Sequence, residues 1–233
     1  MCNTKVLAFL VGIVYSLFVY FLFSGNTFEA ECFSALILPI LTLGYFCGAE
    51  KKSIYFIAFL VLYSISDLMV IVSDVFSDIV YYFVGNSLYI LAYVALVIEI
   101  SKSLNLKEML KHYKFSILVL LLLDSFIAYS LLDVVDPYLD LGSEYFIEIT
   151  YNISMLLILS LALLNYFHQE SRKAFYLLIG AICIVFSEVL NVAYMYVSHQ
   201  NLLSFLTITL ALVGFFFLYQ QTKLKYKKSN PMY

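Results

Sequence analysis

Eight long apolar runs, separated by short polar segments, constrain this chain more than any other feature of its sequence. A helix needs about 20 mostly apolar residues to cross the hydrocarbon core of a bilayer, and each run approaches or exceeds that length. We therefore predict an all-α, polytopic membrane protein, a bundle of eight transmembrane helices forming one membrane domain over residues 1–233. The predicted spans are about Lys5–Phe23, Cys32–Gly48, Ile54–Val72, Ile79–Ser101, Phe115–Leu132, Tyr145–Phe167, Ala174–Val197 and Leu202–Thr222.

The composition excludes the soluble classes of protein. Hydrophobic residues make up 64% of the chain and charged residues 12%, and the mean hydropathy is +0.95. Soluble domains are about 45–50% apolar and about 25% charged. With 13 basic and 16 acidic residues the net charge is −3, which is not the charge of a nucleic-acid binder. Soluble enzymes, disordered linkers and nucleic-acid partners are thus excluded.

The basic residues all fall on one side of the membrane if the eight spans alternate in direction. They precede the first span or follow the second, fourth, sixth and eighth, while the opposite connections carry acidic residues and no basic one. The positive-inside rule places the basic side in the cytoplasm. We therefore expect an integral, multi-pass protein of a bacterial inner (plasma) membrane, with both termini cytoplasmic.

A short internal similarity relates the third span to the seventh. Ser66-Asp67-Leu68 aligns with Ser187-Glu188-Val189 at an offset of four spans. This offset is consistent with two parallel four-helix halves, an arrangement that occurs in some transporter folds.

Acidic and polar side chains inside the predicted spans mark the candidate site, because ionisable groups within a bilayer usually face a cavity or a partner. Asp67 lies in the third span and Glu188 in the seventh, both toward the outer half of the membrane. We predict that they share one polar cavity, open to the outside, with a set of polar residues from the fourth, sixth and seventh spans: Asn86, Tyr89, Tyr93, Glu148, Asn152 and Asn191.

Two carboxylates in one cavity provide the groups for acid–base catalysis. Their mutual repulsion favours a state in which one is protonated and the other ionised, so that a proton donor lies beside an acceptor. The chain has no cluster of Cys and His with metal-ligand spacing, and we predict neither a metal nor a cofactor. The structural alternative is that Asp67 and Glu188 only form hydrogen bonds between helices.

The motifs around these residues resemble those of the YhhN-type lysoplasmalogenase family of eight-span membrane proteins. Ser66-Asp67-Leu68 is similar to the family's Gly-Asp element, Asn86-Ser-Leu-Tyr89 to its His-x-x-Tyr element, and Phe186-Ser187-Glu188 to its F-x-S-D element. The chain departs from the family pattern where Asn86 replaces His, Glu188 replaces Asp, and Leu38 replaces the Lys before Pro39. The resemblance therefore indicates a divergent member.

The resemblance implies a membrane-embedded hydrolase that cleaves the vinyl-ether bond of a lysophospholipid into a fatty aldehyde and a glycerophospho headgroup. It implies that Asp67 and Glu188 are catalytic. Because Glu188 lies deeper in its span than Asp67, we expect Glu188 as the acid and Asp67 as the base and charge stabiliser, or the reverse. The other cavity residues would position the substrate: Asn86, Tyr89, Tyr93, Glu148, Asn152 and Asn191.

Two other classes of function fit the same sequence. A small-solute or proton-coupled transporter also needs a polar cavity with carboxylates at mid-depth. A sensory or partner-binding membrane protein would instead depend on its lipid-facing surface. The expected partner of the hydrolase is a membrane lipid or lysolipid, and the sequence leaves the oligomeric state open.

Overall fold

The computed structural model describes residues 4–49, 52–102, 104, 106–139 and 142–224, and these residues form helices joined by short connections, with no β-strand among them. Within this part of the chain, eight helical segments are long and apolar enough to cross a membrane, which confirms the predicted all-α bundle. The α-helices are α1 (Thr4–Phe23), α2 (Thr27–Gly48), α3 (Ile54–Leu68), α4 (Asp78–Ser101), α5 (Leu106–His112), α6 (Lys114–Val135), α7 (Gly142–Gln169), α8 (Arg172–Val192) and α9 (Asn201–Thr222).

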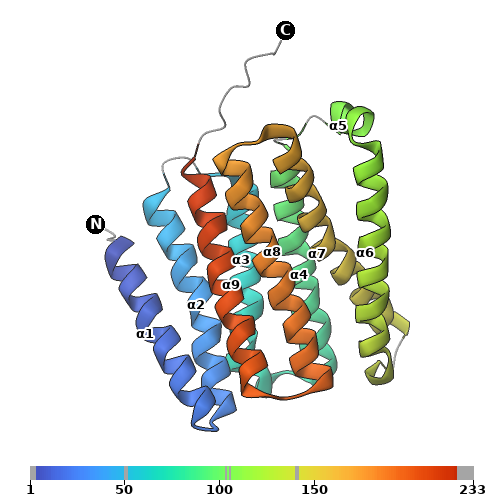
Figure 1. The fold of residues 1–233 in the computed structure, drawn as a ribbon. Coiled ribbons are helices and arrows are strands. Elements are labelled where there is room, and N and C mark those ends of the chain that lie inside the picture. Colours follow the sequence, from blue (N-terminus) through green and yellow to red (C-terminus); the bar gives the residue numbers. More distant parts are fainter. Residues whose placement is uncertain (1–3, 50–51, 103, 105, 140–141, 225–233) are drawn as a thin grey trace.

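Three spans continue beyond their α-helix in a different helical form. The third ends in the 3-10 helix η1 (Met69–Val75), the fifth in the 3-10 turn η2 (Asp136–Tyr138), and the seventh in the π-helical turn η3 (Ala193–Val197). These extensions all lie at the end of the bundle where η1 connects to α4, opposite to α5 (Figure 1).

The structure differs from the prediction at the start of the second span and in the segment after the fourth span. The second span begins at Thr27 and not at Cys32, because Glu29 occupies the first helical turn, where a negative charge stabilises the helix dipole. The polar segment after the fourth span contains the short helix α5, whose Leu, Lys, Glu and Met residues all favour helix. The fifth span ends at Tyr138, six residues beyond its predicted end at Leu132, and the other span ends lie within three residues of their predicted positions.

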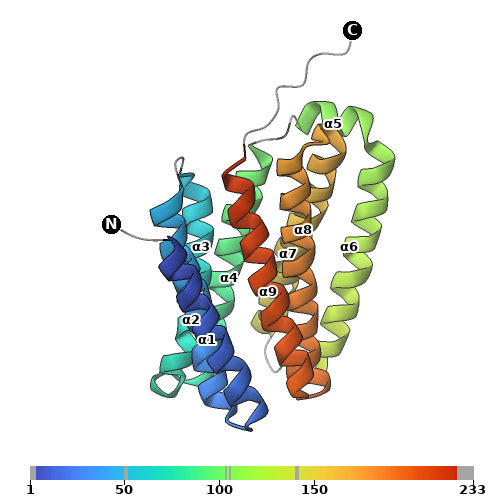
Figure 2. The same cartoon turned by 60° about the vertical axis from the view of Figure 1, so that its left-hand side comes forward.

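The spans form a flattened bundle with α3, α4, α7 and α8 at its centre (Figures 1 and 2). Helix α1 lies at one edge and packs mainly on α2, and α6 lies at the other edge and packs mainly on α7. Helix α9 packs along α8 and reaches α2. The central four helices are therefore the ones that are best placed to enclose polar side chains.

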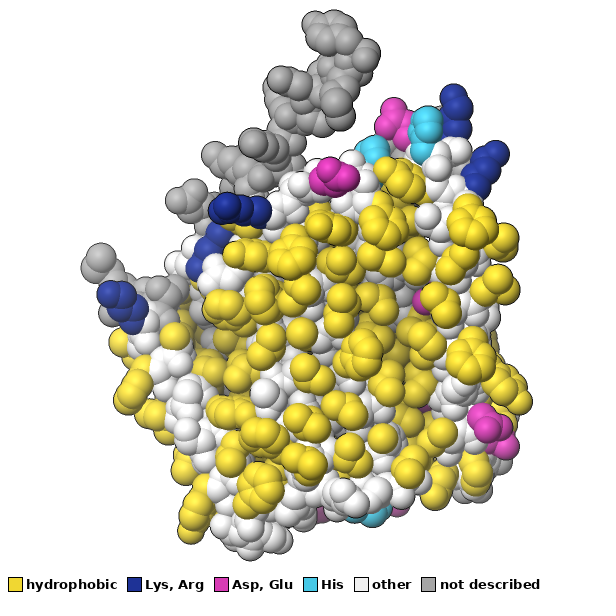
Figure 3. All heavy atoms as spheres, in the orientation of Figure 1, with side chains coloured by type: hydrophobic (Ala, Val, Ile, Leu, Met, Phe, Trp, Pro, Cys, Tyr) yellow, Lys and Arg dark blue, Asp and Glu magenta, His cyan; other side chains and the backbone are white. Residues whose placement is uncertain are grey.

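The outer surface of the bundle is apolar over its middle part, between the two ends. Large hydrophobic side chains are exposed on every spanning helix, including Phe9 on α1, Leu43 on α2 and Phe126 on α6. On the face drawn in Figure 3, hydrophobic side chains cover the middle of the molecule and Lys and Arg side chains lie at the end that carries α5. An apolar middle part with charge at one end is the surface that a bilayer-spanning protein requires.

The two related motifs make matching contacts. The Ser66 hydroxyl of α3 donates a hydrogen bond of 2.9 Å to the Gly85 carbonyl of α4. The Ser187 hydroxyl of α8 donates one of 2.9 Å to the Thr207 carbonyl of α9. The third and fourth helices of α1–α4 and of α6–α9 are thus joined in the same way, which supports the description as two parallel halves.

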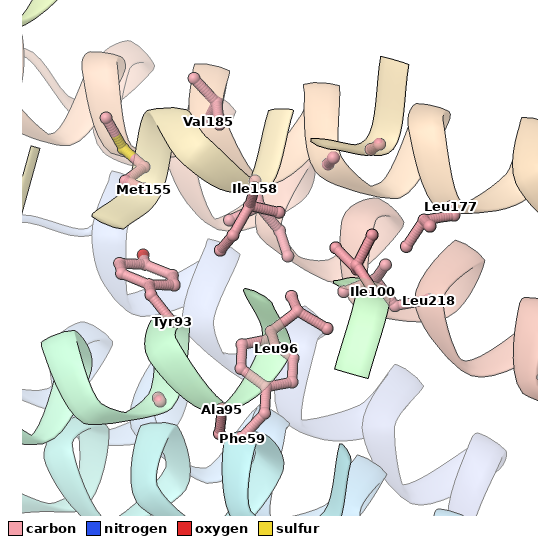
Figure 4. Close-up of a cluster of buried hydrophobic side chains, with 14 of the residues drawn as sticks. Phe59, Tyr93, Ala95, Leu96, Ile100, Met155, Ile158, Leu177, Val185 and Leu218 are labelled. Atoms are coloured by element: carbon pink, nitrogen blue, oxygen red, sulfur yellow. The ribbon is translucent and has the colours of Figure 1, made fainter. Parts of the chain in front are cut away.

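The main apolar core lies at the centre of the bundle and is formed by side chains of α2, α3, α4, α7, α8 and α9, some of which are drawn in Figure 4. Phe59 of α3, Leu96 of α4 and Leu218 of α9 belong to it, and each is 0% exposed. Ala181 and Ile184 of α8 are also part of this core. The core therefore holds the central helices and α9 together.

Helices α8 and α9 approach closely because glycines face each other at their crossing. A Cβ atom added to Gly180 would lie 2.8 Å from Leu218 Cδ2 and 3.1 Å from the Gly214 carbonyl oxygen. Small residues allow such approach in membrane proteins, where van der Waals packing holds helices together.

We expect Gly180→Ala to lower the stability of the protein by about 1–3 kcal/mol, because the added methyl group overpacks this crossing. The matched control is Gly12→Ala on the exposed face of α1, where an added Cβ would meet nothing within 4 Å. Thermal unfolding of both variants in detergent checks the prediction. Equal midpoints for the two variants would contradict it.

Candidate functional site

A cavity of about 420 Å³ enters the bundle from the end opposite to the lysines. Its mouth lies where α2, α4, α7 and α9 begin, and its inner part reaches Tyr63 of α3 and Glu188 of α8. The described residues that line it include no Lys, Arg or His. They include four carboxylates, each from a different helix: Glu31, Asp67, Glu148 and Glu188.

A stripe of tyrosines on α4 connects three of these carboxylates. Residues spaced by seven and four positions lie on one face of a helix, so the hydroxyls point in one direction. Each hydroxyl donates a hydrogen bond to a carboxylate of a different neighbouring helix: Tyr82 to Glu148 of α7 at 2.7 Å, Tyr89 to Asp67 of α3 at 2.6 Å, and Tyr93 to Glu188 of α8 at 2.5 Å.

Glu188 is the centre of this network. Its side chain is 6% exposed and, among the described residues, accepts hydrogen bonds from three tyrosine hydroxyls, those of Tyr63 at 2.6 Å, Tyr93 at 2.5 Å and Tyr151 at 2.7 Å. An ionised carboxylate only accepts hydrogen bonds, so three donors match it without conflict. The same contacts join α3, α4, α7 and α8 around one group.

Asp67 lies in the last turn of α3, half-buried in the wall of the same cavity. Its Oδ1 accepts the hydrogen bond from Tyr89, and its Oδ2 has no hydrogen-bond partner in the described part of the chain. The ring of Tyr89 packs edge to face on the ring of Tyr63, with 4.7 Å between centroids. Because Tyr63 donates to Glu188, one pair of rings links the surroundings of the two carboxylates.

Helices α2 and α9 contribute the polar residues Glu31, Ser34, Ser204 and Thr207 to the lining, and also an apolar wall. It consists of aliphatic and aromatic side chains that face the cavity without a polar group: Ile37, Leu38, Ile208, Leu212 and Phe215. One cavity therefore combines an acidic, hydroxyl-rich wall with an apolar wall, and it presents carboxylates, phenol hydroxyls and amides to whatever enters.

Six of the eight predicted site residues line this cavity: Asp67, Asn86, Tyr89, Glu148, Glu188 and Asn191. The Asn86 amide donates to the Tyr82 carbonyl of its own helix at 3.0 Å. Tyr93 is fully buried and lies behind the cavity wall, where its hydroxyl reaches Glu188. Asn152 is 2% exposed and is not part of the lining, because Tyr151 takes the cavity-facing position next to it.

Three important residues were not in the predicted set. Tyr63 lies four positions before Asp67 and Tyr151 three positions after Glu148, so helical spacing from a known carboxylate could have indicated both. Glu31 was assigned to a connection, and the earlier start of α2 brings it into the wall of the cavity.

The carboxylates of the cavity are not arranged as a metal site. Across the described ranges, no group of three or more His, Cys, Asp or Glu side chains is placed to hold an ion. Tyrosine hydroxyls are instead the partners of Asp67, Glu148 and Glu188.

Comparisons of the chain with protein-family models, with curated proteins and with solved structures find no match. The resemblance to YhhN-type lysoplasmalogenases therefore depends on the short motifs that contain Asp67, Asn86 and Glu188.

We expect Tyr93→Phe to destabilise the protein by about 1.5–3 kcal/mol, because it removes a donor from a buried carboxylate. Tyr176→Phe on α8 is the control, since the Tyr176 hydroxyl has no hydrogen-bond partner among the described residues while its ring packs on Phe217. Thermal unfolding in detergent measures both changes. If the Tyr93→Phe variant is as stable as the Tyr176→Phe variant, this result would contradict the central role of Glu188.

Proposed function

We propose that this protein is a membrane-embedded hydrolase that cleaves the vinyl-ether bond of a single-chain lipid, as its resemblance to YhhN-type lysoplasmalogenases implies. One observation carries the proposal: Asp67 and Glu188 line the same cavity as an apolar wall of α2 and α9. A lysolipid has one acyl-like chain and one polar end, and this cavity offers a surface for each. Its volume of about 420 Å³ also falls within the usual range of ligand sites, roughly 300–1,000 Å³.

The hydrogen bonds favour Asp67 as the proton donor and Glu188 as the ionised partner. Both oxygens of Glu188 accept tyrosine hydroxyls, so this carboxylate is suited to stabilise positive charge in place. Asp67 also lines the cavity, and its Oδ2 accepts no hydrogen bond from the described residues. Of the two assignments that the sequence left open, this supports the one with Asp67 as acid.

The proposed reaction begins when the Asp67 carboxyl transfers its proton to the vinyl carbon that is not bonded to oxygen. The other vinyl carbon then becomes an oxocarbenium ion, whose charge the Glu188 carboxylate stabilises. Water adds to that carbon and gives its proton to Asp67, which restores the acid. The resulting hemiacetal breaks its carbon–oxygen bond to the headgroup side while the proton of its hydroxyl passes to the leaving oxygen, and the products are an aldehyde and an alcohol.

The departures from the family pattern affect how a phosphate is held. Leu38 and Asn86 both line the cavity, at the positions where the family has Lys and His. A phosphate would therefore meet amide and hydroxyl donors but no cation of the described lining. We infer that the phosphate of the substrate stays at the mouth, near the lipid headgroups, and only the vinyl-ether segment reaches Asp67.

We also propose the orientation that the positive-inside rule gives. The lysine-bearing end then faces the cytoplasm of a bacterial inner membrane, with both termini on that side. The acidic cavity opens toward the outer leaflet, from which a lysolipid would enter.

We expect Asp67→Asn to reduce aldehyde release from a lysoplasmalogen by about 100-fold or more, the usual contribution of a general acid. Glu188→Gln should have a similar effect, because it removes the negative charge that stabilises the oxocarbenium ion. Asp124→Asn is the matched control, because Asp124 is also a carboxylate within a span but accepts from Ser160 at 2.6 Å outside the cavity. Wild-type turnover in Asp67→Asn would refute the mechanism.

A transporter is the second candidate, and a second cavity favours it. This cavity, of about 740 Å³, lies at the lysine-bearing end and reaches Leu177 of α8. Along one face of α8, Leu177 is followed by Ala181 and Ile184, buried to 0% and 1% exposure, and then by Glu188 of the first cavity. Two opposed cavities with an apolar barrier between them are the arrangement that alternating access uses.

A cysteine in the barrier distinguishes the two candidates. Ala181→Cys, in a chain whose four native cysteines are replaced, should stay unreactive toward a membrane-impermeant maleimide if the barrier is fixed, as in a hydrolase. Asn191→Cys in the first cavity is the positive control, since its position lines an open space. Labelling of Ala181→Cys in folded protein would favour the transporter.

A further inference from the structure

The cavity at the lysine-bearing end collects positive charge from four separate parts of the fold. The lysines that line it are Lys52 from the connection before α3, Lys102 from the end of α4, Lys173 from the start of α8 and Lys223 from the end of α9. These residues are distant in sequence, so only the folded bundle brings them to one cavity.

The described lining contains four lysine ammonium groups and one carboxylate, which compensates one of their charges. Glu99 accepts a hydrogen bond from the Ser53 hydroxyl and lies 3.8 Å from the Lys102 ammonium nitrogen. Four positive groups and one negative group leave a net charge of three positive units around the cavity. Like charges in one concavity repel one another and attract an anion.

Aromatic rings hold the lysine side chains at the rim. The Lys102 ammonium lies 3.7 Å from the centre of the Tyr55 ring, and the Lys223 ammonium lies 4.1 Å from the centre of the Tyr219 ring. Such contacts fix the stems of the side chains and keep the charged ends at the level of the lipid headgroups. The positive groups are therefore partly ordered before any ligand binds.

The floor of the cavity is largely apolar. Phe56, Leu96 and Leu177 line it, and the polar groups of Gln221 and Thr222 lie nearer to the ends of the helices. A ligand with a charged group at the rim and a hydrocarbon part below it would match both regions. The lining thus favours an amphiphile, although the lysines alone would also attract a soluble anion.

We propose that this cavity is a binding site for a phosphate group, carried by an anionic lipid or by a soluble phosphate ester. Lysine is a common point-charge ligand of phosphate, and basic pockets between transmembrane helices bind phosphate headgroups. The site is separate from the acidic cavity, because the apolar layer of Phe59, Ile184 and Leu218 lies between them. The proposed phosphate site does not depend on whether the protein is a hydrolase or a transporter.

Native mass spectrometry of the full-length protein in neutral detergent tests the proposal by counting bound phosphatidylglycerol and phosphatidylcholine. Each basic residue near a membrane surface strengthens binding of anionic lipid about fivefold, so Lys52→Gln/Lys223→Gln should bind phosphatidylglycerol about 25-fold more weakly. Both lysines are exposed, so their replacement leaves the core intact. Lys111→Gln/Lys114→Gln removes the same charge outside the cavity and should bind like the wild type.

The source of the phosphate follows from a competition with millimolar inorganic phosphate. If phosphate displaces phosphatidylglycerol and raises the melting temperature of the wild type but not of Lys52→Gln/Lys223→Gln, the ligand is a soluble phosphate. If phosphate does neither and phosphatidylglycerol binds in preference to phosphatidylcholine, the ligand is a lipid. Absence of binding by both probes, or equal weakening in the two double variants, would overturn the proposal.

Discussion

The carboxylate of Glu188 is the group on which the arrangement of the central helices depends. A carboxyl group buried within a membrane span is unfavourable by several kcal/mol unless it is hydrogen-bonded or solvated. Three tyrosine hydroxyls, from α3, α4 and α7, supply those hydrogen bonds. Sliding any one of these helices by a turn, about 5.4 Å, would break its bond to Glu188 and leave a buried acceptor unsatisfied. The carboxylate therefore sets the register of the helices that wall the acidic cavity.

The sequence allowed the spans and half of this network to be predicted. Apolar length identifies a membrane helix directly, and the polar stripe of α4 follows from helical spacing, so Tyr89 and Tyr93 were found. Tyr63 and Tyr151 were missed because the chain has 21 tyrosines, any of which could lie at a membrane interface. Helical spacing from Asp67 and Glu148 indicates that Tyr63 and Tyr151 share a face with a carboxylate, but the contact of both with Glu188 depends on how separate helices pack. The start of α2 was missed because Thr27–Glu31 is polar, although it forms the first helical turn.

The two cavities divide the charge of the bundle between its ends. The acidic cavity has four carboxylates and the other has four lysines, with the apolar layer around Phe59 between them. Opposite potentials at the two ends select different ligands, so a phosphate is favoured on one side and disfavoured deep inside the other. For a hydrolase this separation keeps an anionic headgroup away from the catalytic carboxyls. For a transporter it would make the direction of movement depend on the charge of the solute.

The glycine contact between α8 and α9 has a mechanical consequence for the acidic cavity. Gly180 and Gly214 make these helices a closely packed pair, whereas α1 and α2 touch α9 over a smaller surface. The apolar wall of the cavity lies at the seam between α2 and α9, where α9 packs much less extensively than it does on α8. Separating α1 and α2 from α9 would break the Tyr15–Thr209 hydrogen bond of 2.7 Å between α1 and α9, but none of the tyrosine hydrogen bonds to Glu188, whose donors lie on α3, α4 and α7.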